Sequence, residues 1–141
     1  WLHKLATDEN LRLPIIHHPA YSGGFVSPGV SGVADYLQLG LLPRIFGADM
    51  SIFVSYGGRF TFTEEQCKRI SSYIKRPMGL MKAACPAPGG GVTDARLNEL
   101  VELYGNDTMF LVGGDMFRRG PDIEANMSYF VERLTKLSER T

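Results

Sequence analysis

The stretch that most constrains the fold runs from Thr108 to Met116, an apolar segment of strand length that contains two adjacent glycines, Gly113 and Gly114. A short continuous apolar run bounded by glycine is typical of a strand in a buried parallel sheet. Glycines at the end of such a strand let backbone N–H groups approach a phosphate without interference from a Cβ atom, and a following helix adds further donors. The pattern therefore predicts a strand that ends at a small-anion site.

A second glycine run, Gly89–Gly91, follows another apolar segment at Leu80–Ala87. Two successive strands that end on glycines predict one shared phosphate site, as the last two loops of a (β/α)8 barrel form. An ordinary strand-to-helix turn is the alternative interpretation of each glycine pair. The residues that we predict to bind the phosphate are Gly90, Gly91, Gly113 and Gly114.

The rest of the chain repeats a strand-then-helix pattern. The predicted strands are Leu13–His18, Met50–Ser55, Leu80–Ala87 and the segment that begins at Thr108. The predicted helices run from Val33 towards Phe46, from a capping box at Thr63 to Pro77, from a cap at Thr93 or Asp94 to Gly105, and from Ile123 to Leu137.

The strands are apolar rather than alternating, which predicts an α/β fold with a parallel sheet covered by helices. Four strand–helix units make half of a (β/α)8 barrel, and a complete barrel typically needs about 250 residues. The chain has 141 residues and begins with Trp1 rather than methionine. We therefore expect a fragment, or a half-barrel that pairs with another half.

Charge and cysteine content exclude several functional classes. The 15 basic and 15 acidic side chains balance, so there is no electrostatic argument for binding nucleic acid or an anionic membrane. No apolar run reaches the length of a transmembrane helix, and no signal peptide is recognisable. Cys67 and Cys85 are widely spaced, which favours buried thiols in a reduced, cytoplasmic protein over a disulfide or a metal site.

Several short motifs occur in a characteristic order. They are His18-Pro19-Ala20 after the first strand, Gly47-Ala48-Asp49 before the second, Gly90-Gly91, and the turn at Glu102–Asp107 before Gly113-Gly114. As an ordered set they resemble the carboxyl half of the RuBisCO large-subunit superfamily, and the RuBisCO-like (type IV) proteins more than the carboxylases. The resemblance extends from about Leu13 to Phe130. It implies that residues 1–141 are the C-terminal half, strands 5–8, of a (β/α)8 TIM barrel.

The resemblance also implies roles for single residues. Gly91, Gly113 and Gly114 match backbone donors to a substrate phosphate, in agreement with the glycine argument. His18 matches a histidine near the enediolate in the family's active site, and Arg59 aligns with a mobile lysine. We therefore take His18 and Arg59 as candidate catalytic residues. A structural strand-end histidine and a solvated loop arginine are the alternatives.

Other positions depart from the carboxylases. Pro19 replaces an arginine that grips the second phosphate of a bisphosphate, Ile52 replaces a histidine, and Gly89 replaces a serine. These departures imply a substrate with one phosphate and argue against CO2 fixation. In the family, the lysine and carboxylates that bind Mg²⁺ belong to an earlier part of the barrel. We therefore expect a Mg²⁺ cofactor whose ligands lie in the missing N-terminal half.

The resulting hypothesis is an enzyme that enolises, isomerises or decarboxylates a phosphorylated ketose or keto acid through a Mg²⁺-stabilised enolate. The full-length parent is expected to be a homodimer or higher oligomer, with this chain inactive alone. The alternatives are an authentic ribulose-bisphosphate carboxylase large chain and a non-catalytic half-barrel that binds a phosphometabolite. We also expect His17 to be structural, Asp115 to point away from the anion site, and Arg118 and Arg119 to be solvated.

Overall fold

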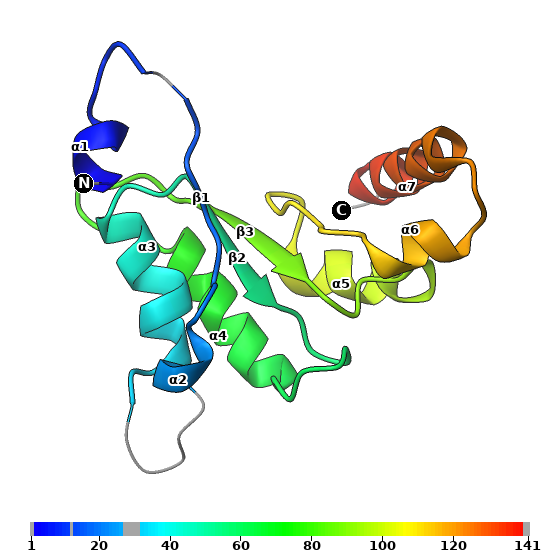
Figure 1. Ribbon diagram of the computed structural model, residues 1–141, viewed down its shortest axis with the longest axis horizontal. Helices are drawn as coiled ribbons and strands as arrows, with labels where there is room; N and C mark the ends of the chain where they lie inside the picture. The colour runs from blue at the N-terminus through cyan, green and yellow to red at the C-terminus, as the bar shows by residue number, and fades with distance from the viewer. Residues whose placement is uncertain (1, 12, 27–31, 140–141) are drawn as a thin grey trace.

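The computed structural model describes residues 2–11, 13–26 and 32–139. It has a mixed α/β fold built on a three-stranded parallel sheet in the order β1-β2-β3 (Figure 1). The strands are β1 (Ile16–His17), β2 (Met50–Val54) and β3 (Cys85–Gly89). Residue His17 is opposite Ser51, and Val54 is opposite Gly89. The predicted α/β fold with a parallel sheet is confirmed.

The fourth predicted strand lies beside β3 but does not form a regular ladder. The N–H groups of Met109 and Leu111 donate to the carbonyls of Pro86 and Pro88 at 2.9 and 3.1 Å, and a single parallel bridge joins Gly89 to Leu111. Pro86 and Pro88 face this segment and have no N–H to donate in return. The prediction of a regular strand from Thr108 is therefore wrong. The segment lies beside β3, but β3 offers it only carbonyl acceptors and no N–H donors.

Helices cover one face of the sheet: η1 (Tyr36–Leu41), α3 (Leu42–Ile45) and α4 (Glu64–Lys75). Figure 1 shows α3 and α4 together on that side. Ser51, Phe53 and Ser55 point towards the helices and are fully buried. The alternate β2 residues, including Ile52 and Val54, are only partly buried, so the second face of the sheet is more open.

The ends of these helices follow their sequence signals. Thr63 and Gln66 form the predicted capping box at the start of α4, and Pro43 lies in the first turn of α3, where the helix restarts. Between Val33 and Phe46 the predicted helix begins only at Tyr36 and first winds as the π-helix η1. Leu39 is 1% exposed, whereas Val33 is 38% exposed.

The remaining helices are α1 (Leu2–Ala6), α2 (Gly23–Val26), η2 (Asp94–Arg96), α5 (Leu97–Tyr104), α6 (Gly114–Arg118) and α7 (Ile123–Ser138). Two predictions are corrected, and one helix is new. Strand β3 begins at Cys85 rather than Leu80, whose side chain is fully exposed. The short helix α6 was not predicted. Neither Thr93 nor Asp94 caps α5, because the 3-10 turn η2 intervenes.

A buried arginine holds the edge of the sheet where the strands begin. Arg44 is 3% exposed, and its Nη1 and Nη2 donate to the carbonyls of Tyr73 and Lys82 at 2.7 and 2.9 Å. Its guanidinium therefore joins the end of α4 to the segment before β3. Burial, and secondarily the charge of Arg76, lower the pKa of Arg44.

No helix among the described residues is long and apolar enough to cross a membrane.

Phe53 is one of the largest fully buried side chains among the described residues. It is 0% exposed, and its ring meets the ring of Tyr104 edge-on, with 5.8 Å between centroids. We expect Phe53→Ala to lower the free energy of unfolding by about 3–5 kcal/mol, because it removes buried apolar area and leaves a cavity. Urea unfolding followed by circular dichroism measures the change. Val131→Ala, at a position 55% exposed on α7, is the control; equal losses in the two variants would contradict the prediction.

His17 points to the helix-covered face, as expected for a structural residue. Its Nδ1 lies 3.1 Å from the Ser51 hydroxyl, which donates to the Leu39 carbonyl at 2.6 Å. Ser51 is therefore the acceptor, and the neutral ring donates to it. Burial, and to a smaller extent the charge of His18, lower the pKa of His17.

This shift predicts pH-dependent stability. The unfolded state binds a proton near the ordinary histidine pKa of about 6.5, whereas the folded state binds it only at a lower pH, so stability should be full above about pH 6.5 and fall as the pH decreases. The midpoint of urea unfolding should decrease between pH 7.5 and 5.5, and less steeply in His17→Gln. His18→Asn should keep most of the slope, because burial is the larger cause. An equally steep slope in His17→Gln would refute the assignment.

Candidate functional site

The predicted site residues all lie at the edge of the sheet where the parallel strands end. His18 directly follows β1, and Gly90 directly follows β3. Arg59 lies in the loop between β2 and α4, and Gly113 comes two residues after Leu111, which pairs with β3. Parallel strands end at one edge, which is where α/β proteins place their ligand sites.

Two glycine loops touch each other at this edge. A Cβ atom on Gly91 would lie 2.8 Å from the backbone nitrogen of Gly58, and one on Gly58 would lie 2.9 Å from the nitrogen of Gly91. Gly91 also has a φ of 71°, which favours glycine. The loop after β2 and the loop after β3 are thus in direct backbone contact, at a distance that no side chain at either position allows.

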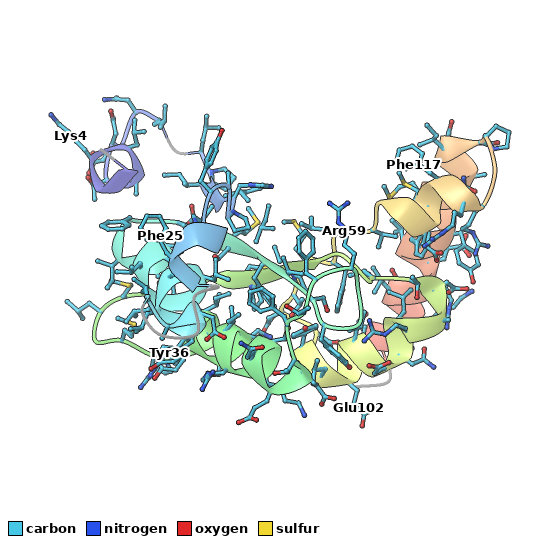
Figure 2. All side chains as sticks on the ribbon, turned by 60° about the horizontal axis from the view of Figure 1, so that its bottom comes forward. Lys4, Phe25, Tyr36, Arg59, Glu102 and Phe117 are labelled. Carbon is cyan, nitrogen blue, oxygen red and sulfur yellow. The ribbon has the colours of Figure 1, made fainter. Side chains whose placement is uncertain are left out.

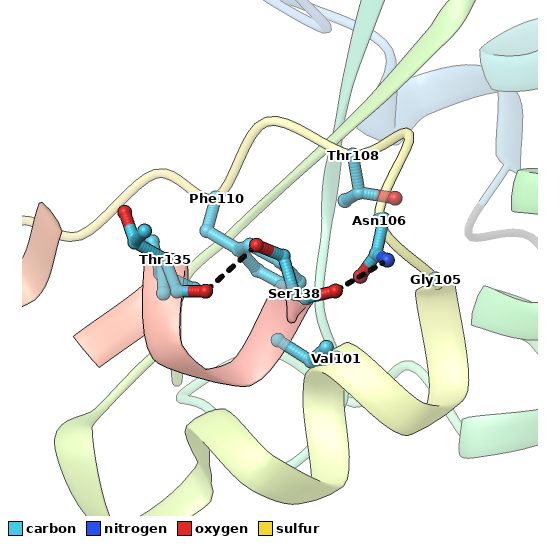
Figure 3. A pocket seen from close by; sticks show the side chains of 8 residues that line it. Val101, Gly105, Asn106, Thr108, Phe110, Thr135 and Ser138 are labelled. Carbon is cyan, nitrogen blue, oxygen red and sulfur yellow. Dashed lines mark hydrogen bonds between the residues drawn. The ribbon is translucent and has the colours of Figure 1, made fainter. Parts of the chain in front are cut away.

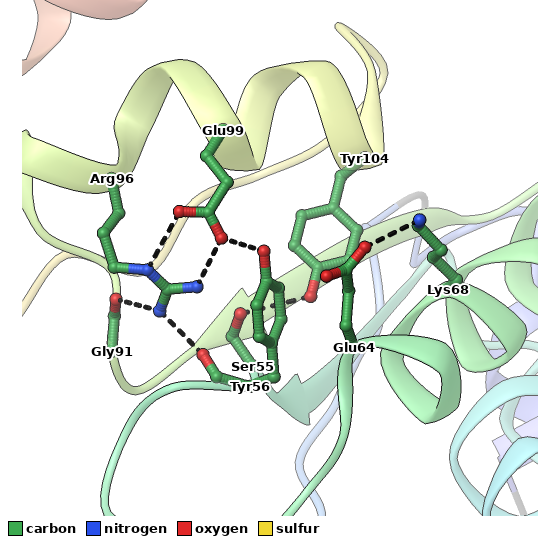
Figure 4. A network of polar contacts seen from close by, with 8 residues as sticks. All are labelled: Ser55, Tyr56, Glu64, Lys68, Gly91, Arg96, Glu99 and Tyr104. Carbon is green, nitrogen blue, oxygen red and sulfur yellow. Dashed lines mark hydrogen bonds and ion pairs between the residues drawn. The ribbon is translucent and has the colours of Figure 1, made fainter.

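Arg96 joins the same two loops through their carbonyl groups (Figure 4). Its Nη1 donates to the carbonyl of Tyr56 at 2.7 Å and to the carbonyl of Gly91 at 3.1 Å. The guanidinium carbon lies 4.5 Å from the centre of the Tyr56 ring. A Cβ atom on Gly57 would approach Nη1 to 2.5 Å, so this glycine also makes room for the arginine.

Glu99 fixes the orientation of the Arg96 guanidinium. Its carboxylate accepts from Nη2 of Arg96 at 2.9 Å and also from the Tyr56 hydroxyl. The hydrogen bond from Arg96 is the main reason why the pKa of Glu99 is lowered. Burial and the contact with Glu99 raise the pKa of Tyr56 to about 12, so its hydroxyl stays protonated and donates.

Asp94, at the other end of η2, faces away from these loops and towards α7. Its carboxylate accepts from the Tyr129 hydroxyl at 2.7 Å and from Nε of Arg133 at 3.3 Å. Arg119 lies 3.7 Å from the same carboxylate, over the Tyr129 ring. The Tyr129 hydrogen bond is the main cause of the lowered pKa of Asp94.

The predicted glycine pair Gly113 and Gly114 leads into α6 rather than into α7. The carboxylate of Asp115 accepts from the backbone N–H of Asp94 at 2.8 Å, so it caps η2. Its other oxygen lies 3.5 Å from Arg118. Arg118 is 70% exposed, as predicted for a solvated residue. Arg119 is exposed as well, with a side chain that is 33% accessible, but it also pairs with Asp94.

The two candidate catalytic side chains are exposed. His18 has its side chain on the face of β1 opposite to His17, and its carbonyl accepts from the N–H of Ala20 at 2.9 Å. Figure 2 shows Arg59 projecting away from the ribbon. Its guanidinium lies 5.0 Å from the centre of the Phe60 ring. Both side chains are thus accessible to a ligand at this edge.

A cavity of about 220 Å³ lies elsewhere, between the ends of α5 and α7 (Figure 3). Val101, Phe110 and Leu134 supply its apolar lining, and Asn106 donates to the Ser138 carbonyl beside it. Gly105 and Thr108 place it where the fourth segment begins, at the edge opposite to the glycine loops. It contains none of the predicted site residues.

Within residues 2–11, 13–26 and 32–139, no three histidine, cysteine, aspartate or glutamate side chains gather closely enough to hold a metal ion. The described residues therefore do not fit a Mg²⁺ site by themselves. The expectation of Mg²⁺ ligands outside this chain stays a prediction.

Sequence reasoning missed the residues that hold the loops together. Arg96 and Asp94 stand between a glycine run and an amphipathic helix, where charged residues are ordinary. Only their spacing gives a signal, since Arg96 and Glu99 are three apart and Arg96 follows Gly91 by five residues. Their long-range partners, Tyr56 and Tyr129, could not be identified without the fold.

Three curated relatives match most of this chain. It is 35% identical over 118 residues to ribulose bisphosphate carboxylase-like protein 1 of Rhodopseudomonas palustris, covering 84% of this chain and 30% of that protein. It is 31% identical to a 5-methylthioribulose-1-phosphate isomerase of Rhodospirillum rubrum, covering 79% of this chain and 30% of the relative. It is 33% identical to a 2,3-diketo-5-methylthiopentyl-1-phosphate enolase of Exiguobacterium sibiricum, covering 80% of this chain and 28% of the relative. The chain thus spans about 30% of the length of these relatives.

Solved structures give the same result. A RuBisCO-like protein of Alicyclobacillus acidocaldarius superposes with a TM-score of 0.88 at 28% identity, covering 99% of this chain and 35% of that one. A RuBisCO-like protein of Rhodopseudomonas palustris superposes with a TM-score of 0.77 at 32% identity, covering 94% of this chain and 33% of that one. No protein-family model matches the sequence. The relatives and the shared fold together identify this chain as a member of the RuBisCO family, similar to its RuBisCO-like members.

Proposed function

We propose that this chain is the C-terminal half, strands 5–8, of a (β/α)8 barrel in a RuBisCO-like enzyme. The enzyme enolises, isomerises or decarboxylates a phosphorylated ketose or keto acid and does not fix CO2. Relatives named as an enolase and an isomerase of methylthio-sugar phosphates support this class of substrate. The whole of residues 1–141 would form one structural unit of that barrel.

One observation carries the proposal: glycine loops from neighbouring strands meet where the strands end. Gly58 touches Gly91, and the pairing of Gly89 with Leu111 brings Gly90 and Gly113 to the same edge. Loops with so few side chains leave backbone N–H groups accessible, and such groups bind phosphate well. Gly90, Gly91, Gly113 and Gly114 would hold the phosphate in this way.

Gly113 and Gly114 have the space that this role requires. A Cβ atom on Gly113 would meet no atom within 4 Å, and one on Gly114 would meet only Arg118, at 3.9 Å. Gly114 begins α6, and the N–H groups of a first helical turn have no acceptor within their helix. The carboxylate of Asp115 is engaged by Asp94, which keeps it directed to η2.

The chemistry is the removal of a proton next to a carbonyl, which places negative charge on the carbonyl oxygen. The exposed Arg59 would neutralise part of that charge, and His18 would form a hydrogen bond to the reacting part of the substrate. Pro19 and Ile52 offer no polar group to a second phosphate, so a monophosphate fits better than a bisphosphate.

The parent protein would contribute the remaining parts. Mg²⁺, held by residues outside this chain, would stabilise the enolate when bound. A homodimer or higher oligomer would complete the site. The chain alone is expected to bind phosphate weakly and to be inactive.

A glycine substitution tests the phosphate site. We expect Gly113→Ala to leave the melting temperature unchanged, since its methyl group meets no protein atom. The same methyl group would occupy the space of the phosphate. The loss of one hydrogen bond to a charged group costs about 1.5–3 kcal/mol, so the dissociation constant for inorganic phosphate should rise roughly tenfold or more. Gly24→Ala, also with no neighbour within 4 Å, is the control; unchanged phosphate affinity in Gly113→Ala would exclude Gly113 from the site.

The reaction itself is tested with the full-length protein in deuterated water. The substrate is a ketose or diketo monophosphate, such as those in the names of the two relatives. We expect the proton next to its carbonyl to be replaced by deuterium, and NMR measures the rate of this exchange. Arg59→Met should slow this exchange by about 100-fold, as the loss of an electrostatic contact to the transition state does. Incorporation of labelled CO2 into ribulose bisphosphate would instead establish an authentic carboxylase. Phosphate binding without exchange would establish a binding protein.

A further inference from the structure

The short turn η2 contacts all three glycine-containing segments, although it contains no glycine itself. Arg96 donates to the carbonyls of Tyr56 and Gly91, in the loops after β2 and β3. Two residues earlier, the backbone N–H of Asp94 donates to Asp115, which follows Gly114. We define the η2 clamp as Asp94, Arg96 and these contacts.

We propose that the η2 clamp is the positioning element that fixes the spacing of the glycine segments and thereby shapes the phosphate site. This inference rests on the proposed function for its role in binding. The side chains of the clamp are not themselves ligands of the phosphate in this proposal, although Arg96 bonds the carbonyl of Gly91. It acts through the backbone of the segments that it holds.

The Arg96 arm sets the distance between the first two loops. One guanidinium nitrogen bonds both carbonyls, so neither loop can move without losing a hydrogen bond to a charged donor. Glu99 restrains the guanidinium from the opposite side through both Nη2 and Nε. The side chain of Arg96 is only 20% exposed, which reduces competition from water.

The Asp94 arm sets the position of the third segment. Its carboxylate binds Tyr129 and Arg133 of α7 and pairs with Arg119, which follows α6. Asn126 of α7 is buried and donates to the carbonyl of Met116 at 3.0 Å, so α6 and α7 are joined as well. Asp94 therefore holds α6, and with it Gly114, against the loop that contains Gly91.

The contacts of Arg96 and the contacts of Asp94 predict separate effects. Arg96→Met should speed amide hydrogen exchange in residues 56–59 and 90–92, and Asp94→Ala should speed it in residues 113–118. Each variant should also weaken the binding of inorganic phosphate by about tenfold or more, because a displaced donor no longer reaches the ligand. Arg96→Lys should restore the affinity only in part, because an ammonium group lacks the planar fork of a guanidinium.

Arg44 provides a matched control. It is a buried arginine that also donates to two backbone carbonyls, but at the opposite edge of the sheet. Arg44→Met should lower the melting temperature at least as much as Arg96→Met. It should leave phosphate affinity and the exchange of the glycine loops unchanged. If Arg96 had a purely structural role, Arg96→Met and Arg44→Met would not differ in phosphate affinity or in the amide exchange of the glycine loops.

The outcomes separate this inference from the proposed function. Unchanged exchange in the glycine loops of Arg96→Met and Asp94→Ala would overturn the clamp, as would faster exchange with unchanged phosphate affinity. If the wild-type protein binds no phosphate while the variants show the predicted exchange, the phosphate site is wrong and the clamp stands as the element that holds the loops.

Discussion

The contact between Gly58 and Gly91 is the constraint on which the arrangement at the carboxyl edge depends. Two backbone segments from different loops approach so closely that a Cβ atom on either would overlap the other. The carbonyl groups of Tyr56 and Gly91 thereby come close together, and Arg96 donates a hydrogen bond to each of them. The glycines permit the approach, and the arginine makes it favourable.

The sheet provides the platform for this contact. Its helix-covered face is filled by Phe53 and the side chains around it, while the opposite face remains partly exposed, with Ile16 at 48%. A one-sided core is sufficient to align three parallel strands. It brings their carboxyl ends to one edge, and all six predicted site residues follow strands or strand-like segments at that edge.

Much of the fold could be predicted from local signals, because local chemistry determines it. The capping box at Thr63 and the glycine after Tyr104 mark helix ends through contacts within a few residues. The order of strands and helices follows from apolar periodicity. The strand at Leu80 was placed too early because an apolar run does not show which of its residues are buried. The sequence also predicts a regular fourth strand. That strand is irregular because Pro86 and Pro88 of β3 have no N–H groups to donate to it.

The candidate site was predictable only in part. Glycines at strand ends are visible in the sequence, and the structure brings Gly90 and Gly91 against the loop that carries Arg59. The residues that hold these loops were not found, because Arg96 and Asp94 act through partners about 35 to 40 positions away. Charge alone does not distinguish such residues from solvated ones.

The bonds that Arg96 makes to the two loops have a consequence for how this region can change. Its acceptors there are main-chain carbonyls, so, apart from Tyr56 and the glycines that pack against Arg96, the attachment does not depend on the side chains of those loops. Arg59 lies just beyond the anchored glycines and takes no part in the attachment. The side chain at that position can therefore be exchanged during evolution while the backbone of the two loops keeps its place, so that the chemistry of the loop and the proposed binding of a phosphate can diverge separately.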